Sequence, residues 1–175
     1  MPKKTDPILA LDPGLRELGF AVLAGRRLVA AGVRPLRLLP KAARLREARR
    51  LVAGWTRAYH PRAIVFEATY RHPVDSLDAL HRLTLSAGRI AKRRRIAIAS
   101  YAPQSVRKSV HGDGWATKRQ LAEAIAVRFP ALRVYLTQDR RWKERYWLNM
   151  FDAISLALHH QSRSAKPPSR SRSSG

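Results

Sequence analysis

The sequence predicts a layered α/β domain in which helices cover a mixed β-sheet. Apolar runs of strand length open the chain, and later runs alternate with segments whose apolar residues repeat at helical spacing. Hairpin-connected strands followed by alternating helices and strands favour a mixed sheet over a helical bundle or a β-sandwich. With 175 residues, of which 45% are hydrophobic, the chain is long enough for one domain with a substantial core.

The first part of the chain predicts a group of strands and a helix. Strands are expected over residues 8–12, 19–24 and 28–33, and "AGRR" is typical of a hairpin turn between the last two. A helix follows, because apolar residues then recur at helical spacing. Its repeating positions are Leu45, Ala48, Val52, Trp55 and Tyr59. The apolar run "AIVFEA" predicts a fourth strand, which finishes on Glu67.

The rest of the chain predicts one more strand and several helices. A helix over residues 74–92 carries an apolar stripe and leads through "RRR" into the strand "IAIASY". The stripe consists of Leu80, Leu83, Ala87 and Ile90. A short helix at "APQSVRKSV" and a loop at "HGDGWA" come next, and Thr117 and Gln120 then have the spacing of a capping box that starts another helix. A last helix is expected over about residues 143–161.

The charge of the chain indicates a polyanionic partner. The sequence holds 35 Lys and Arg against 12 Asp and Glu, a net charge of +23, and nucleic acid is the commonest polyanion that such proteins bind. An anionic membrane surface, the ribosome and a solubility adaptation are the alternatives. We expect a basic N-terminal extension over residues 1–7, the folded domain over 8–161, and a disordered Ser/Arg-rich basic tail over 162–175.

The absence of cysteine excludes disulfides and cysteine-ligated zinc, and it fits a reducing compartment. The apolar run near the N-terminus is short and is interrupted by Asp12. Neither a signal peptide nor a transmembrane span is therefore expected, and no membrane partner.

Three acids stand where a carboxylate is costly to bury. Asp12 and Glu67 each close an apolar strand, and Asp152 lies in "LNMFDAISLALHH", where we expect it to be at least half buried. A cap or a salt bridge to an arginine explains each acid taken alone. If the fold brings them together, however, like charges require a counter-charge, which Mg²⁺ or Mn²⁺ supplies through oxygen ligands. Such a site in a basic protein indicates phosphodiester hydrolysis by paired metal ions.

Four motifs together resemble a known family in order and spacing. They are "ILALDPGLRELGFAVL", "AIVFEATY", "YAPQSVRKSVHGDGWATKRQL" and "DAISLALHH", and from Ile8 to His160 the chain resembles the RuvC family of crossover junction endodeoxyribonucleases. The resemblance implies a ribonuclease H-like fold, with a mixed five-stranded sheet of three antiparallel strands followed by parallel ones. It also implies a magnesium-dependent homodimer that resolves four-way (Holliday) DNA junctions by symmetric nicks.

The resemblance assigns the site residues one by one. Asp12, Glu67 and Asp152 match the family's catalytic and metal-binding acids, and two Mg²⁺ ions per site are implied, with Mn²⁺ as a substitute. Asn149 stands three residues before Asp152, where the family usually has a second Asp or a His. Its amide oxygen is still able to ligate Mg²⁺, but it adds no charge and cannot act as a base. Lys118 matches a lysine near the scissile phosphate, where it either assists the chemical step or only positions the phosphate.

The expected DNA-binding residues are Tyr70, Arg107, Lys108, Lys118 and Arg119. Tyr70 lies where relatives carry an aromatic residue that wedges into the junction, and stacking would stabilise unpaired bases by about 1–3 kcal/mol per base. An ordinary half-buried loop tyrosine is the alternative. The helix over residues 74–92 matches the family's dimer-forming helix, although its apolar stripe fits a core-facing surface equally well.

Two other functions remain open at this stage. A YqgF-like relative with the ribonuclease H fold would act on structured RNA, and such proteins typically lack the dimer helix. A junction-binding protein with weakened catalysis would explain Asn149. A branch-migration helicase is a candidate partner, and a bacterial source would imply a cytoplasmic, nucleoid-associated protein, with an organelle or a phage-infected cell as alternatives.

Overall fold

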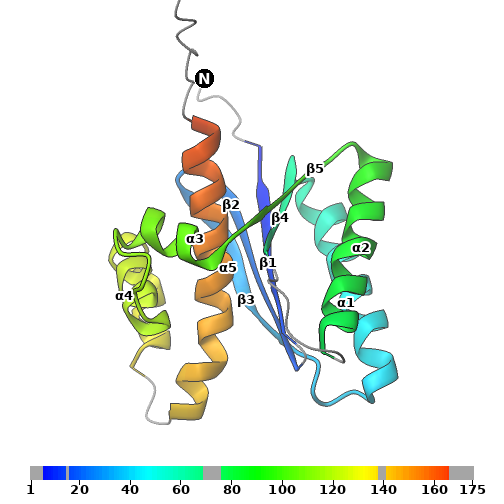
Figure 1. Ribbon diagram of the computed structural model, residues 1–175, viewed down its shortest axis with the longest axis horizontal. Coiled ribbons are helices and arrows are strands. Elements are labelled where there is room, and N and C mark those ends of the chain that lie inside the picture. Colours follow the sequence, from blue (N-terminus) through cyan, green and yellow to red (C-terminus); the bar gives the residue numbers. More distant parts are fainter. Residues whose placement is uncertain (1–5, 15, 69–75, 138–140, 166–175) are drawn as a thin grey trace, which may run out of the picture.

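The protein is described by a computed structural model over residues 6–14, 16–68, 76–137 and 141–165. A sheet of five strands stands at its centre, between two layers of helices (Figure 1). The strands are β1 (Ile8–Pro13), β2 (Glu17–Ala24), β3 (Arg27–Pro35), β4 (Ala63–Glu67) and β5 (Ala97–Tyr101). The helices are α1 (Lys41–Tyr59), α2 (Ser76–Arg94), α3 (Pro103–Val110), α4 (Lys118–Arg128), the 3-10 helix η1 (Pro130–Tyr135) and α5 (Arg141–Ala165).

The sheet is mixed, as the sequence predicts. Its strand order is β3-β2-β1-β4-β5. The first three strands in sequence are antiparallel neighbours, whereas β4 runs parallel to β1 and β5 runs parallel to β4. A tight turn joins β2 to β3, and Gly25 supplies its left-handed backbone with a φ of 56°. The parallel pairing places the carboxyl ends of β1 and β4 side by side.

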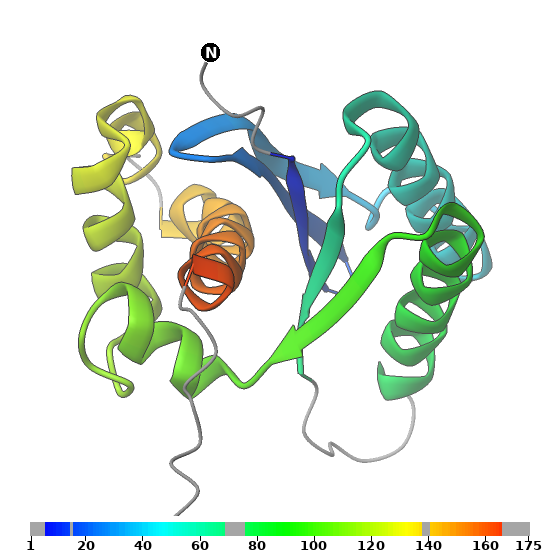
Figure 2. The ribbon, with the colours of Figure 1, turned by 90° about the horizontal axis from the view of Figure 1, so that it is seen from above.

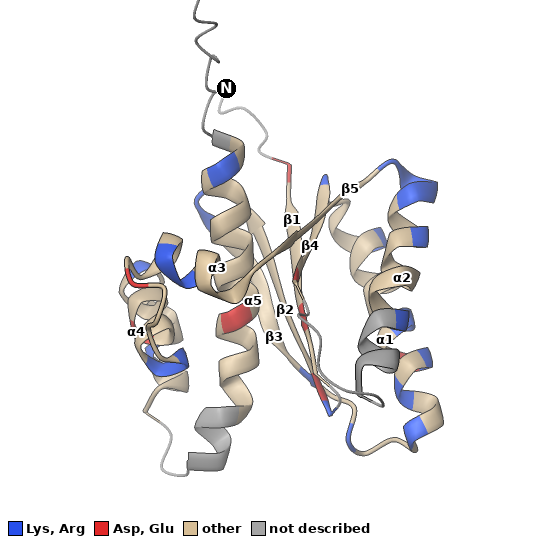
Figure 3. Ribbon diagram, in the orientation of Figure 1, with Lys and Arg blue, Asp and Glu red and all other residues tan. Residues whose placement is uncertain are grey.

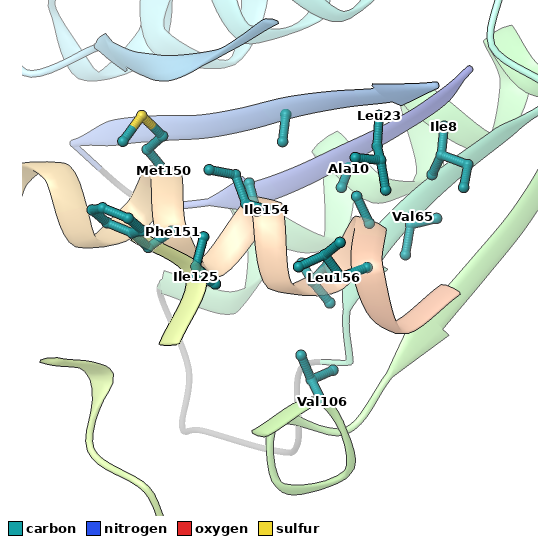
Figure 4. Packing of buried hydrophobic residues seen from close by; sticks show 14 of the residues in the cluster. Ile8, Ala10, Leu23, Val65, Val106, Ile125, Met150, Phe151, Ile154 and Leu156 are labelled. Carbon is teal, nitrogen blue, oxygen red and sulfur yellow. The ribbon is translucent and has the colours of Figure 1, made fainter. Parts of the chain in front are cut away.

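Alternate strand residues point to opposite faces of the sheet and build two separate cores. On one face, Ile8 and Val65 pack in a cluster with Ile154 of α5 (Figure 4). On the other face, Leu11 belongs to a cluster with Trp55 of α1. Seen from above, α3, α4 and α5 lie on one side of the sheet, and α1 and α2 lie on the other (Figure 2). Within the described ranges, no helix combines the length and the apolar character needed to cross a membrane.

The apolar stripe of α2 faces the core. Leu83 and Ala87 are 4% and 0% exposed, and Ile90 packs against the same cluster at its margin. The side chain of Leu80 lies outside the described residues. The core-facing interpretation of this stripe is therefore correct, and a dimer contact on α2 would need another face of the helix, where Leu85 is 50% exposed.

α5 is longer than predicted at both ends. It runs from residue 141 to residue 165, so residues 162–165 are helical and the expectation of a disordered tail beginning at residue 162 is wrong. The hydroxyls of Ser162 and Ser164 donate to helix carbonyls three and four residues earlier, at 2.8 and 3.0 Å. These bonds satisfy the hydroxyl groups within the helix, so the serines are compatible with its continuation to residue 165. Residues 1–5 and 166–175 lie outside the described part of the chain.

Candidate active site

Two acids lie at the carboxyl ends of neighbouring parallel strands. On β1, Ala10 faces α5, and the alternation of strand residues places Asp12 on the same face. On β4, Val65 faces α5, and the same alternation places Glu67 there. The parallel register sets Ala10 beside Val65, so the two acids, each two residues further along, end their strands at the same place.

α5 reaches the sheet beside Asp12 because Gly19 has no side chain. Gly19 is the β2 partner of Asp12, and a Cβ atom on it would lie 2.2 Å from the backbone oxygen of Asn149. No carbon fits in this space, so the backbone of the helix rests directly on β2. Asp152 follows nearly one turn later and is 6% exposed, which confirms its predicted burial.

We expect Gly19→Ala to lower the free energy of unfolding by about 3 kcal/mol, the upper range for overpacking a tight site. The methyl group would force α5 away from β2 at the point where the helix meets the acids. Denaturant unfolding measures the loss, and Gly54→Ala is the matched control. A Cβ at Gly54 on α1 meets nothing within 4 Å, so this control should stabilise the helix by about 0.5–1 kcal/mol. Equal stability of both variants would contradict the close approach.

The three acids are close enough to interact electrostatically. Burial and the charge of Asp152 raise the pKa of Asp12 to about 8, with a further contribution from Glu67 and an opposing one from Lys118. Burial and Asp152 likewise raise the pKa of Glu67, against the opposing charges of Lys118 and Arg107. Both shifts come first from burial and then from like charge, so these acids need further positive charge nearby if they are all to be ionised together.

Lys118 supplies part of the missing charge from within the protein. Its Nζ donates to Oδ2 of Asp152 in an ion pair, in which the Lys118 side chain is 50% exposed and the Asp152 side chain 9%. Burial alone would lower the pKa of Lys118, but the charges of Asp152, Asp12 and Glu67 outweigh it, so the pKa is raised. Lys118 is therefore a protonated ammonium at neutral pH.

A capping box fixes the position of Lys118 at the start of α4, as the sequence predicts. The N–H of Thr117 donates to Oε1 of Gln120 at 2.8 Å, and the N–H of Gln120 donates to Oγ1 of Thr117 at 3.2 Å. Lys118 is the first residue of the helix. It therefore lies at the helix end whose backbone N–H groups attract phosphate.

Asn149 is held by two residues that the sequence analysis does not identify. Its Nδ2 donates to Oε2 of Glu17 at 3.2 Å, and Nη1 of Arg37 donates to Oε1 of the same carboxylate at 2.6 Å. Glu17 lies two residues before Gly19 on β2, so strand alternation places both on the face that α5 covers. This alternation is a signal in the sequence that Glu17 lies on the α5 side of the sheet, as Asp12 and Glu67 do, but it does not identify Asn149 as its partner.

The donor set of the site fits a hard divalent cation. Carboxylate and amide oxygens are the ligands that Mg²⁺ and Mn²⁺ prefer, and the raised pKa values of Asp12 and Glu67 indicate that Lys118 alone does not balance their charge. Among the residues that the structure describes, no three His, Asp or Glu side chains are already arranged as a metal-binding group. An oxygen of Asp152 is instead engaged by Lys118.

The predicted DNA-binding residues that the structure describes lie on α3 and α4. Arg107 is half-buried and close enough to Glu67 to influence its pKa, whereas Lys108 is exposed on α3. Arg119 is exposed on α4 and pairs with an acid one turn later at 2.9 Å. Tyr70 lies outside the described residues. Most Lys and Arg segments lie on the flanking helices, whereas acidic segments occur on the central strands, on α5 and in the loop before α4 (Figure 3).

Comparison with known proteins identifies the family of this chain. The family model of the crossover junction endodeoxyribonuclease RuvC matches residues 8–160. The RuvC protein of Rhodopseudomonas palustris (strain BisB18) is 35% identical over 163 residues, covering 87% of this chain and 85% of the relative. The RuvC protein of Chelativorans sp. (strain BNC1) is 32% identical over 170 residues, covering 91% of each chain.

Solved structures share the fold. Thermus thermophilus RuvC has a TM-score of 0.70 at 20% identity, covering 90% of this chain and 95% of its own. The same protein in complex with a Holliday junction substrate has a TM-score of 0.72 at 19% identity, covering 91% and 94%. The expected ribonuclease H-like arrangement of the mixed sheet is therefore confirmed. Because the family match spans residues 8–160 and relatives above 30% identity cover most of both chains, this chain belongs to the RuvC family of crossover junction endodeoxyribonucleases.

Proposed function

We propose that the chain is an endodeoxyribonuclease that resolves four-way (Holliday) DNA junctions by metal-dependent hydrolysis of phosphodiester bonds. The observation that carries this proposal is the convergence of Asp12, Glu67 and Asp152 beside Lys118 in a chain of the RuvC family. The acids come from two strands and a helix that are distant in sequence, and a merely structural cluster would be expected to have its charges paired.

We propose two Mg²⁺ ions per site, with Mn²⁺ as a substitute. Asp12, Glu67 and Asp152 would hold them, and Asn149 would add a neutral amide oxygen. The chemistry that such ions supply when bound is activation of water and neutralisation of charge on the phosphate. The three acids form one electrostatic group, because the charge of Asp152 raises the pKa of both Asp12 and Glu67.

Lys118 would act on the phosphate as a cation. Its raised pKa keeps it protonated, so it is unsuited to take a proton from water. It stands at the N-terminus of α4, and half of its side chain is exposed. From there the ammonium would stabilise the charge that develops on the phosphate as the oxygen–phosphorus bond to water forms and the backbone phosphorus–oxygen bond breaks.

The DNA would lie across the basic residues of α3 and α4, with Arg107, Lys108 and Arg119 contacting phosphates. The net charge of +23 supports strong attraction to the DNA backbone. We also propose a homodimer, since two sites related by a two-fold axis would suit a four-way junction. Exposed apolar side chains near the edge of the sheet support a contact there: Leu85 on α2 is 50% exposed and Ile98 on β5 is 45% exposed.

A nicking assay tests the proposal directly. Synthetic mobile and immobile four-way junctions, a linear duplex of the same sequence and a structured RNA are incubated with the full chain over a titration of Mg²⁺. We expect paired nicks in junction strands of like polarity and no cleavage of the RNA. Cleavage of the RNA alone would favour an RNA nuclease. Junction binding that survives chelation, without nicks in Mg²⁺ or Mn²⁺, would identify a binding protein without catalysis.

A further inference from the structure

We infer that Glu17 and Arg37 are positioning residues that fix the side-chain amide of Asn149 with its oxygen available to the carboxylate site. Asn149 stands where the family usually has a charged or imidazole ligand, so its amide must be oriented if it is to bind a cation. The inference rests on the proposed function, and it concerns how this chain works with a neutral residue at that position.

The hydrogen bonds determine which end of the amide faces Glu17. A carboxylate only accepts hydrogen bonds, so the amide must present its NH₂ group to Oε2 of Glu17, at 3.2 Å. Arg37 donates to the other carboxylate oxygen at 2.6 Å and thereby holds the Glu17 side chain in place. Among the described residues, no donor meets Oδ1 of Asn149. The amide oxygen is therefore the atom left for a ligand.

The position of Asn149 on α5 places the base of its side chain beside the strand end that carries Asp12. The Cβ of Asn149 lies 3.1 Å from where a Cβ on Gly19 would be, and Gly19 is the direct cross-strand partner of Asp12. Asn149 and Asp152 are three residues apart on α5 and share a face of the helix. Without a partner that fixes it, the amide would have to become ordered when the cation binds, and this ordering would weaken binding.

Both oxygens of Glu17 are engaged, by Arg37 and by Asn149. Glu17 therefore orients Asn149, and it does not need to touch the metal itself. This arrangement has a consequence for Asn149→Asp, the substitution that restores the usual family acid. Alone, it would set a new carboxylate against the carboxylate of Glu17. In the double variant with Glu17→Gln, the direction of the hydrogen bond would be reversed: the NH₂ group of the glutamine at position 17 would donate, and the new carboxylate at position 149 would accept.

A double-mutant cycle on the full chain tests the inference. The affinity for Mn²⁺ is measured without DNA from the electron paramagnetic resonance signal of the free ion, and single-turnover nicking and thermal unfolding are measured in parallel. We expect Glu17→Gln to weaken Mn²⁺ binding about tenfold, the lower range for loss of a group that orients a ligand. We expect the double variant to bind Mn²⁺ at least about tenfold more tightly than Asn149→Asp alone.

Two further variants serve as control and as safeguard. Glu47→Gln on α1 breaks an exposed carboxylate–arginine pair of the same kind, with Arg50 at 2.6 and 2.7 Å, away from the site. It should leave the Mn²⁺ affinity unchanged. If Glu17→Gln fails to fold, Arg37→Gln takes its place in the experiment. The Arg37 side chain is 43% exposed, so its replacement should disturb the fold less. We expect a smaller loss of Mn²⁺ affinity than for Glu17→Gln.

The outcomes separate this inference from the proposed function. Suppose that Glu17→Gln binds Mn²⁺ with wild-type affinity and that Asn149→Asp binds it as tightly as the double variant. Glu17 would then only stabilise the fold through its ion pair with Arg37. This result would overturn the inference and leave the proposed function standing. A wild-type chain that neither binds Mn²⁺ nor nicks junctions would overturn the proposed function as well. Affinity restored in the double variant supports both.

Discussion

Asp12→Asn should abolish junction nicking, reducing the rate on the order of 10³-fold or more, because the metal site supplies several kcal/mol of transition-state stabilisation. Asp12 closes β1 opposite Gly19 and interacts with both other acids. The amide is nearly isosteric, so the fold and the basic surface remain, and binding of the junction should be retained. Single-turnover nicking and a binding assay at the same salt concentration measure the two effects. Nicking at the wild-type rate would show that Asp12 is not part of the catalytic site.

The same variant should change how stability depends on pH when no metal is bound. The pKa of Asp12 is about 8 in the folded chain, against an ordinary value of 3.8. Between these values the folded state holds a proton that the unfolded state has released, so the free energy of unfolding falls as pH rises from about 4 to 8. Asp12→Asn carries no titrating group at this position, and its melting temperature should fall less over this range.

Thermal unfolding in a chelator at pH 5 and pH 8 checks this dependence. Adding a divalent cation at pH 8 should raise the melting temperature of the wild type, because the cation binds the folded state. It should raise that of Asp12→Asn much less. An identical loss of stability between pH 5 and pH 8 in both proteins would show that the burial and like charges around Asp12 do not govern its protonation.

The mixed sheet and the position of two acids at one edge of it can be expected from the sequence for a physical reason. Strand residues alternate between two faces, so an acid that interrupts the apolar face of a strand is visible in the chain itself. Asp12 and Glu67 both do so, and the parallel pairing of β1 and β4 brings their ends together. Asp152 is visible for a related reason, because it interrupts an otherwise apolar helix.

The remaining parts of the site depend on contacts across the fold. The ion pair of Lys118 and Asp152 joins residues 34 positions apart, and the bond from Asn149 to Glu17 spans 132 positions. Neither partner can be chosen from spacing, because many cations and acids in the chain have the same local pattern. Gly19 is similar: only the approach of α5 reveals that no side chain fits there. The Ser/Arg-rich composition of residues 162–165 predicts disorder, whereas the structure continues α5 through them, with two serine hydroxyls bonded to helix carbonyls.

Lys118→Met should reduce the rate of nicking about 10²-fold, the loss typical of removing one group that stabilises transition-state charge. The variant keeps the apolar stem and removes the ammonium that contacts Asp152. Affinity for Mn²⁺ without DNA should rise, because the cation no longer competes with Lys118 for that carboxylate. Without metal, the variant should be less stable than the wild type at pH 8, since three carboxylates lose their nearest cation.

Single-turnover nicking at saturating protein separates the two roles open for Lys118. If it only positions the phosphate, the variant should bind the junction more weakly but cleave the bound junction at the wild-type rate. If it stabilises developing charge, the rate on bound junction should fall. Arg128→Met at the other end of α4 removes the same charge far along the helix, so it controls for the general loss of attraction to DNA. Because the neighbouring carboxylates raise the pKa of Lys118, we expect it to act as a cation and not as the base. The rate of Lys118→Met should therefore keep the wild-type dependence on pH, and a changed pH profile would contradict its assignment as a permanent cation.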